Sequence, residues 1–237
     1  MKAKPVVRNG FRNRILDRLP RKELGRIKKA LTEFDAEIRT EIYEPNKPFE
    51  HVYFPETAIA SVVNVLEDGT EIEVATVGYE GMVGLAIFLG TNQTAARAFW
   101  QVAGTAFRLD GAFLQKEKRN GSALAATLGL YTLGFFTQIA QSVTCNRRHS
   151  LEQRCARWLL MTHDRVPGDD FPLKQEFLAQ MLGVRRTGVS EVAGKLQRKG
   201  VIKYSRGCLS VTNRRGLERL SCGCYQVVAR EYRRLLG

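Results

Sequence analysis

Hydrophobic and polar positions follow more than one spacing along the chain. Between residues 38 and 110 the spacing is short, and in Glu71–Val77 the apolar Ile72 and Val74 alternate with glutamates. A period of two predicts a half-buried strand. The dipeptide Asp68-Gly69 just before it is a favoured hairpin turn. Several short strands separated by turns predict an antiparallel jelly roll over this region.

The spacing of apolar residues is helical on both sides of the strand-rich region. Residues 13–31 predict helix, interrupted at Pro20 because proline cannot continue a helix interior. After Gly121 the apolar positions step by four and three residues, as in a coiled-coil seam. This seam comprises Leu124, Leu128, Tyr131 and Phe135. It is expected to pack either inside its own domain or against a second copy.

Residues 173–213 carry the most specific pattern in the chain. A short amphipathic helix over 176–182 is followed by Gly183, which suits a tight turn because glycine tolerates positive φ. A second helix over 184–196 follows. Two helices joined by so short a turn predict a helix-turn-helix. Alternating residues on both sides of Arg206-Gly207 then predict a hairpin, the wing of a winged helix.

The charge balance supports a polyanionic partner. The chain has 37 Lys and Arg against 24 Asp and Glu, a net charge of +13, and +9 of it falls in residues 151–237. Charge of this kind also suits a solvated basic face or an acidic membrane. The predicted helix-turn-helix favours nucleic acid.

Composition excludes several classes of protein. With 237 residues, 44% hydrophobic and 26% charged, the chain has an ordinary globular mixture. No uninterrupted apolar run approaches the roughly 18 residues that cross a bilayer. The N-terminus lacks the apolar segment of a secretion signal. We therefore expect a soluble cytoplasmic protein without a membrane partner.

The five cysteines are late and irregularly spaced, which is not a disulfide framework. Cys222-Gly-Cys224 has no second Cys/His pair near it in the sequence. Since tetrahedral sites need four converging ligands, the pattern favours reduced thiols over zinc. The sequence therefore predicts no metal and no cofactor.

An enzyme on a jelly roll is a remote alternative. Cupin-like metal sites need several histidines, and the strand-rich region contains only His51. The sequence shows no phosphate-binding loop and no nucleophile elbow. No catalytic residue is predicted, and we expect that the protein is not an enzyme.

The segment Phe177-Leu-Ala-Gln-Met-Leu-Gly-Val-Arg-Arg-Thr-Gly-Val-Ser190 resembles the Crp/Fnr family of bacterial transcription regulators. The likeness extends over nearly the whole chain. Glu80-Gly-Met-Val-Gly-Leu85 and Cys145-Asn-Arg-Arg-His149 are similar to one branch of the family. The resemblance implies an α+β fold in three parts. These are a cyclic-nucleotide-binding-like β-roll with an N-terminal helix (1–110), a dimerisation helix (111–148) and a winged helix-turn-helix (149–237).

The resemblance also assigns site residues. The N-terminal end of a recognition helix enters the major groove, where one arginine can bind guanine through two hydrogen bonds. Expected base contacts are Arg185, Arg186, Thr187, Ser190 and Glu191. Arg186 aligns with the family's base-reading arginine, so the alternative for Arg185 is a phosphate contact. Expected phosphate contacts are Lys195, Arg198 and Arg206. Leu124, Leu128, Tyr131 and Phe135 would then form a homodimer on a palindromic operator, and the family also implies contact with RNA polymerase.

The expected effector pocket departs from the pattern of cyclic-AMP-binding members. Gly84 and Arg97 match two family positions, but Leu85 replaces a glutamate and Ala98 replaces a hydroxyl residue. Ordinary cyclic-AMP binding is therefore not expected. An iron–sulfur cluster of the family's N-terminal type is excluded, since no cysteine precedes Cys145. The sequence predicts a homodimeric, sequence-specific DNA-binding regulator; the alternative is a form gated by a nucleotide-like ligand.

Overall fold

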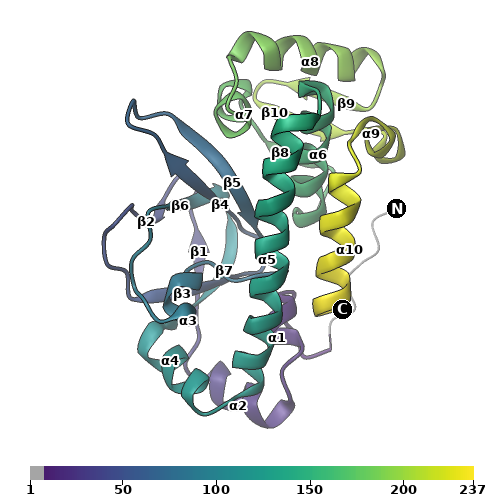
Figure 1. The fold of residues 1–237 in the computed structure, drawn as a ribbon. Helices are drawn as coiled ribbons and strands as arrows, with labels where there is room; N and C mark the ends of the chain where they lie inside the picture. The colour runs from purple at the N-terminus through teal and green to yellow at the C-terminus, as the bar shows by residue number, and fades with distance from the viewer. Residues whose placement is uncertain (1–7) are drawn as a thin grey trace.

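Two antiparallel sheets face each other in the N-terminal half of the computed structural model, which describes residues 8–237 (Figure 1). The larger sheet has the order β2 (Glu41–Tyr43), β6 (Arg97–Val102), β4 (Ile59–Val65), β5 (Glu71–Val77). The smaller sheet has the order β1 (Thr32–Ala36), β7 (Gly104–Asp110), β3 (His51–Pro55). Small and aromatic side chains, including Ala60, Ala98 and Trp100, fill the space between them. The predicted antiparallel roll is confirmed; residues 1–7 of its expected range lie outside the described residues.

Short helices surround the roll, and their ends follow from local sequence. Pro20 separates α1 (Arg14–Asp17) from α2 (Arg21–Lys28), as predicted. Helix α3 (Leu85–Leu89) follows Gly84, whose φ of +94° is a conformation that favours glycine. These helices pack with α5 in one apolar core.

Residues 111–148, the expected dimerisation part, contain two helices. The chain forms α4 (Gly111–Arg119) and α5 (Ala123–Arg148), because Gly121 adopts a φ of +64° and ends the first helix. The hydroxyl of Ser122 then accepts a hydrogen bond from the Ala125 N–H and caps the second helix.

Helix α5 runs through the middle of the molecule, with α10 (Cys224–Leu236) alongside it (Figure 1). Of the described helices, α5 is long and apolar enough to span a membrane by length and composition alone. The expectation from uninterrupted apolar runs missed this, because threonine, glycine and glutamine interrupt the apolar residues without adding charge. In the structure α5 packs against α10 and β5 of its own chain.

The C-terminal part begins with α6 (Leu151–Arg165), whose first turn is closed by a capping box between Ser150 and Gln153. It continues, in chain order, through β8 (Asp170–Pro172), α7 (Gln175–Leu182), α8 (Arg186–Arg198), β9 (Ile202–Ser205), β10 (Cys208–Val211), α9 (Arg214–Leu220) and α10. Its core is continuous with the roll: Phe99 of β6 meets Phe177 of α7 edge-to-face, with ring centroids 6.1 Å apart.

The glycine-rich segment after β5 allows the helices to approach the roll closely. A Cβ at Gly81 would lie 2.5 Å from the Tyr131 ring, and one at Gly78 would lie 2.7 Å from the Arg165 side chain. Arg165 instead reaches the buried Glu80 carboxylate, with 2.7 and 3.0 Å hydrogen bonds. Burial lowers the pKa of Arg165, but the charge and hydrogen bond of Glu80, together with Tyr232 and Asp164, raise it overall. This segment therefore fixes α5 and α6 against the roll.

Candidate nucleic-acid interface

The two helices of the predicted helix-turn-helix are joined by a turn that depends on glycine. Gly183 ends α7 with a φ of +62°. Its N–H donates to the carbonyl of Gln180, and the N–H of Val184 donates to that of Ala179, both at 3.0 Å. This pattern satisfies the last carbonyls of the helix. The turn therefore places α8 directly after α7, as predicted.

Helix α8 has a buried face and an exposed face. Val189, Val192 and Leu196 are buried against the core of the C-terminal part. The opposite face projects from the top of the molecule, away from the roll (Figure 1). The predicted contact residues that are exposed there are Arg185, Arg186, Thr187, Glu191, Lys195 and Arg198.

Ser190 differs from the other predicted base contacts, because its hydroxyl is engaged inside the chain. It donates to Gln175 Oε1 at 2.6 Å and lies 3.1 Å from the carbonyl oxygen of Arg186. The side chain is half-buried between α7 and α8. Its visible role is to hold the two helices together.

The wing forms as predicted from the hairpin sequence. Strands β9 and β10 pair in antiparallel fashion, and β8 adds a third strand. Arg206 and Gly207 both have positive φ, +48° and +79°, as a type I′ turn requires. Tyr204 donates from its hydroxyl to the Leu173 carbonyl and ties the wing to the start of α7. Arg206 is thus exposed at the tip of an anchored hairpin.

The exposed cations of this face are available to an external partner. Among the described residues, Arg185, Arg186, Lys195, Arg198 and Arg206 have no carboxylate oxygen within ion-pair distance, unlike neighbouring Lys199, which pairs with Glu152. Clustered exposed cations without ion-pair partners are the electrostatic footprint of a polyanion site.

The four expected effector residues lie on two elements, Gly84 and Leu85 at the start of α3 and Arg97 and Ala98 on β6. Gly84 packs against Val52 of the smaller sheet. Arg97 lies on the larger sheet, and Ala98 is fully buried. The Arg97 guanidinium is bonded to Glu41 at 3.0 Å and to Glu71. These ion pairs contribute to a raised pKa of Arg97, although burial acts in the opposite direction and is the largest single influence.

A relay of polar contacts connects Arg97 with the helix-turn-helix. Glu71 holds Arg97 through one carboxylate oxygen and accepts a 2.8 Å hydrogen bond from Gln180 Nε2 of α7 through the other. The hinge residue Gly183 lies beside Ile72 of the same strand. The N-terminal end of β5 is therefore where the roll contacts α7.

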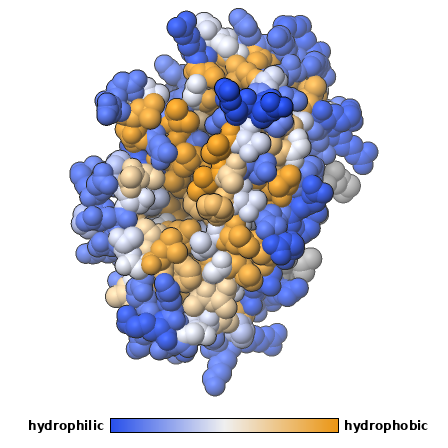
Figure 2. Space-filling view, viewed as in Figure 1, coloured by the Kyte–Doolittle hydropathy of each residue, from blue (hydrophilic) through white to orange (hydrophobic). Residues whose placement is uncertain are grey.

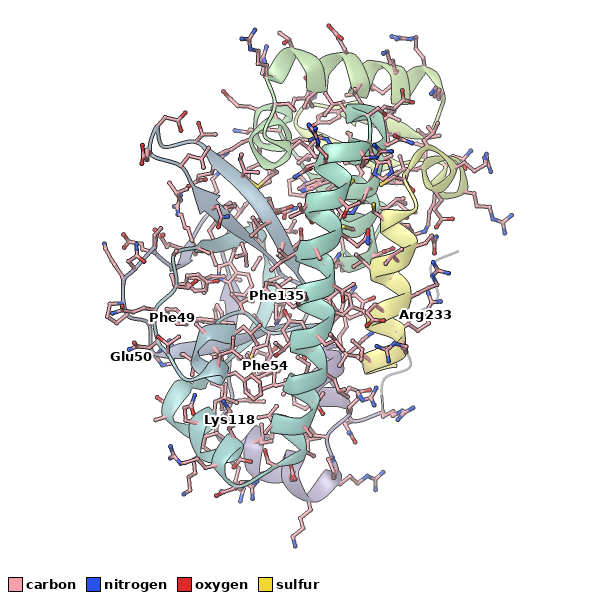
Figure 3. The ribbon with its side chains drawn as sticks, viewed as in Figure 1. Phe49, Glu50, Phe54, Lys118, Phe135 and Arg233 are labelled. Carbon is pink, nitrogen blue, oxygen red and sulfur yellow. The ribbon has the colours of Figure 1, made fainter. Side chains whose placement is uncertain are left out.

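The structure corrects the predicted dimerisation seam. Leu124, Leu128 and Tyr131 are each 0% exposed within a single chain, so they offer no surface to a partner. Tyr131 stacks on Tyr232 of α10 and donates to the Met82 carbonyl at 3.0 Å. Phe135 is partly buried and faces the roll from α5 (Figure 3). Three of the four residues therefore belong to the interior, and Phe135 lies at its edge.

Another face of α5 carries the exposed apolar residues. Leu130, Leu133, Phe136 and Val143 are 42 to 67% exposed. Figure 2 shows apolar surface running down the middle of this side of the molecule, over α5. Gly129, Leu133, Phe136, Ala140 and Val143 step by four and three residues, as the buried seam does.

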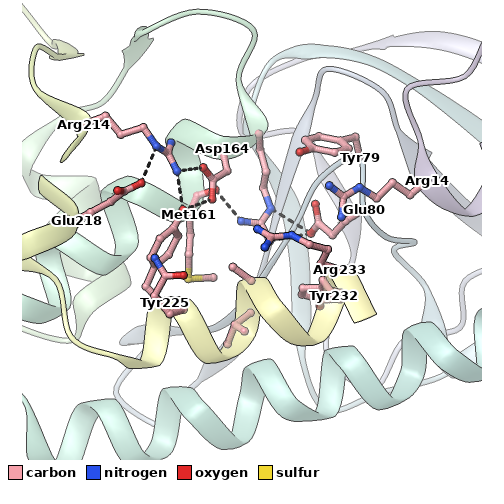
Figure 4. Close-up of a pocket in the computed structure, with 14 residues that line it drawn as sticks. Arg14, Tyr79, Glu80, Met161, Asp164, Arg214, Glu218, Tyr225, Tyr232 and Arg233 are labelled. Carbon is pink, nitrogen blue, oxygen red and sulfur yellow. Dashed lines mark hydrogen bonds and ion pairs between the residues drawn. The ribbon is translucent and has the colours of Figure 1, made fainter. Parts of the chain in front are cut away.

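A polar cavity of about 350 Å³ lies between α6, α9, α10 and the N-terminal region (Figure 4). Arg214 organises one wall: it bonds Asp164 at 2.6 Å, Glu218 at 2.9 Å and the Tyr225 hydroxyl at 2.6 Å. Burial raises the pKa of Tyr225, with a further contribution from Asp164. In this wall Arg214 is paired with carboxylates of its own chain. These bonds anchor α9 and α10 to α6.

Sequence reasoning missed one cluster. Cys222 and Cys224 are joined in space by Cys145 and His149 from the end of α5, and the potential ligand atoms of all four lie within 4.8 Å of one another. The signal was present as Cys145-x-x-x-His149, since residues four apart share one helix face. Only the fold brings this pair to the cysteines near the C-terminus.

The geometry defines a winged helix-turn-helix protein with an N-terminal β-roll. Residues 153–220 match the Crp-like helix-turn-helix domain. No curated protein matches the sequence. FixK2 from Bradyrhizobium japonicum is similar in structure, with a TM-score of 0.69 and 22% identity, covering 81% of this chain and 98% of that one.

Two further solved structures share the fold. A Crp/Fnr-family regulator from Eubacterium rectale has a TM-score of 0.67 and 17% identity, covering 85% of this chain and 94% of its own. The global regulator CLP from Xanthomonas campestris has a TM-score of 0.63 and 15% identity, with coverages of 81% and 99%. The C-terminal part thus matches a Crp-like helix-turn-helix domain, and the chain as a whole shares the fold of these Crp/Fnr-family structures.

Proposed function

We propose that the chain is a cytoplasmic homodimer that binds a two-fold symmetric DNA operator. The observation that carries this proposal is the exposed N-terminal end of α8, where Arg185 and Arg186 stand without carboxylate partners among the described residues. In winged helix-turn-helix proteins this end reads base edges in the major groove. Arg186 binds guanine, while Arg185 contacts phosphate.

The remaining exposed residues of the interface divide by role. Thr187 and Glu191 face the groove beside Arg186, where a glutamate can accept from cytosine N4. Lys195 and Arg198 follow on the exposed side of α8, and Arg206 stands at the wing tip. These three contact phosphates and fix the register of the protein on the duplex. Ser190 contributes indirectly, through its hydrogen bond to Gln175.

The dimer is proposed to form through the exposed face of α5. A single winged helix covers too few base pairs for useful specificity, and two-fold operators match two-fold proteins. Leu133, Phe136 and Val143 lie on a stripe of coiled-coil spacing along this helix, with Leu130 exposed beside it. In this arrangement residues 1–110 form the sensing part, 111–148 the dimerisation part and 149–237 the DNA-binding part. Contact with RNA polymerase remains a prediction from the family.

Selection of binding sites from fragmented genomic DNA tests the proposal. The account predicts recovery of inverted repeats whose half-sites are separated by about 34 Å, one helical turn. Recovery of DNA without a shared sequence would reject sequence-specific binding. Recovery of single, unrepeated half-sites would reject the dimer.

A second candidate, an effector-gated form of the same regulator, is favoured by the polar relay at the end of β5. An anionic ligand that drew the Arg97 guanidinium away from Glu71 would change the contact of Glu71 with Gln180 on α7. CLP is described as responsive to c-di-GMP. The selection repeated with a panel of nucleotides separates the two forms, because gating requires DNA binding to change with the ligand.

A further inference from the structure

Four potential metal ligands converge where α5 ends and α10 begins. Cys145 lies in the last turn of α5 and His149 is the residue that follows the helix, while Cys222 and Cys224 flank Gly223 at the start of α10. Cys145 Sγ is 3.4 Å from Cys222 Sγ, and Cys224 Sγ is 3.6 Å from His149 Nδ1. The cluster therefore joins two segments that are 73 or more residues apart in the sequence.

The spacing of the four atoms suits one tetrahedral ion. Zinc–sulfur and zinc–nitrogen bonds of about 2.3 and 2.0–2.1 Å place neighbouring ligand atoms about 3.5–3.8 Å apart. The four ligand atoms all lie within 4.8 Å of one another, so small side-chain shifts complete the tetrahedron. Two-iron clusters also use cysteine and histidine, but they divide their ligands between two metal atoms and need wider spacing.

The surroundings of the cluster also indicate an ion. The three cysteines form a small buried cluster of their own, apart from the larger apolar cores. Arg157 of α6 lies within electrostatic reach of Cys145 and Cys224. Its buried Nε finds no hydrogen-bond partner among the described residues. A buried cation beside a cluster of thiols calls for compensating negative charge.

We propose that Cys145, His149, Cys222 and Cys224 form a Cys₃His site for Zn²⁺. Three thiolates, a neutral imidazole and Zn²⁺ sum to one negative charge, which Arg157 balances. Binding releases the thiol protons to solvent and changes no oxidation state. With all four positions taken by protein, the site is structural.

The position of the site gives it a defined effect. His149 ends α5, and Ser150 begins α6, so the ligands surround the joint that leads into the helix-turn-helix. Helix α10 packs along one side of α5, and the same ion would fix it there. Bound zinc therefore holds α10 in place and limits movement at the α5–α6 joint.

The metal content of the purified full-length chain tests the proposal. Protein produced with added zinc, dialysed against a weak chelator, is expected to retain a single Zn²⁺ per chain by elemental analysis. The Cys222→Ser/Cys224→Ser variant should lose it. Cys208→Ser, which removes an exposed cysteine of the wing, should keep it.

A second measurement separates ligand loss from misfolding. Co²⁺ added to the metal-free protein should give the visible and charge-transfer absorption of a tetrahedral thiolate site. His149→Cys supplies a fourth thiolate and should retain metal with a shifted spectrum. Retention of zinc by the double serine variant would overturn the assignment. So would purification with iron and sulfide, or a Cys145–Cys222 disulfide in a wild-type chain that takes up no metal.

Discussion

Trp158 of α6 donates a 2.6 Å hydrogen bond from its indole nitrogen to the carboxylate of Glu73 in β5. The same carboxylate accepts from Ser61 at 2.6 Å and from Thr76 at 3.0 Å. Burial raises the pKa of Glu73 above its ordinary value, although these hydrogen bonds act in the opposite direction. A carboxyl group of the roll thus connects the roll to α6, the first helix of the C-terminal part.

This connection predicts a pH dependence of stability. Since the folded-state pKa of Glu73 is raised, the folded chain keeps a proton over a pH range in which the unfolded chain has lost it. The contribution of Glu73 to the free energy of unfolding is fully present below its ordinary pKa near 4.5. It is lost as the pH rises through the higher pKa of the folded state. Within that window each pH unit lowers the free energy of unfolding by at most about 1.4 kcal/mol.

Glu73→Gln should remove this slope, because the amide has the shape of the protonated acid and no charge. Denaturant unfolding of wild type and variant at a series of pH values measures it. Glu67→Gln, at the exposed hairpin tip, serves as the control and should keep the wild-type slope. An unchanged slope in Glu73→Gln would show that another group titrates.

The exposed seam predicts where dimerisation can be broken. Leu133→Glu with Phe136→Glu should give folded monomers in sedimentation, because both side chains are exposed and apolar on α5. Leu89→Glu changes an equally exposed leucine on α3 and should leave the dimer intact. A double variant that sediments as a dimer would exclude this face as the interface.

Leu128 should behave differently, since it is fully buried within one chain. Leu128→Ala should lower the free energy of unfolding by about 2–5 kcal/mol through the cavity it creates. Its dimerisation constant should stay close to that of wild type. Loss of dimerisation at unchanged stability would restore the seam that the sequence suggested.

The two seams mark the limit of what the sequence could predict. Period-two alternation identified β5, and Gly183 identified the turn before α8, because both signals are local. Helix α5 is apolar on several sides, and its buried and exposed seams repeat with the same steps. The spacing of apolar residues alone could not show which seam of α5 is buried. Helix α10, about a hundred residues later in the chain, covers one side of α5.

The sequence missed the proposed metal ligands for a similar reason. Cys222-Gly-Cys224 offered half a tetrahedral site, and the other half, Cys145 and His149, lies on a different helix. Their convergence depends on α10 folding back along α5. The expected effector pocket rested on matching Gly84 and Arg97 to positions of the family. In the structure, Arg97 instead pairs with carboxylates of its own chain.

Cyclic AMP is predicted not to bind. Leu85 cannot accept a hydrogen bond from a ribose, Ala98 is buried without a hydroxyl, and Arg97 is held by Glu41 and Glu71. Calorimetry should detect no binding at about 1 mM, where affinity corresponds to only about −4 kcal/mol. A micromolar dissociation constant would mean that the pocket rearranges to expose the arginine.

The division between base reading and phosphate contact is the central claim about the interface. A base-reading arginine contributes about 1–3 kcal/mol at one position of a half-site, while a phosphate contact acts on all sequences alike. Arg186 stands at the start of α8, and Lys195 lies further along its exposed side. Substitution of each by alanine separates the two roles.

The direct measurement is a titration of wild type, Arg186→Ala and Lys195→Ala against a selected operator and random DNA at several salt concentrations. The account predicts that Arg186→Ala weakens operator binding while leaving random DNA nearly unaffected. Lys195→Ala should weaken both and reduce the log–log salt slope by about one per site. Equal loss on operator and random DNA for Arg186→Ala would contradict base reading by this side chain.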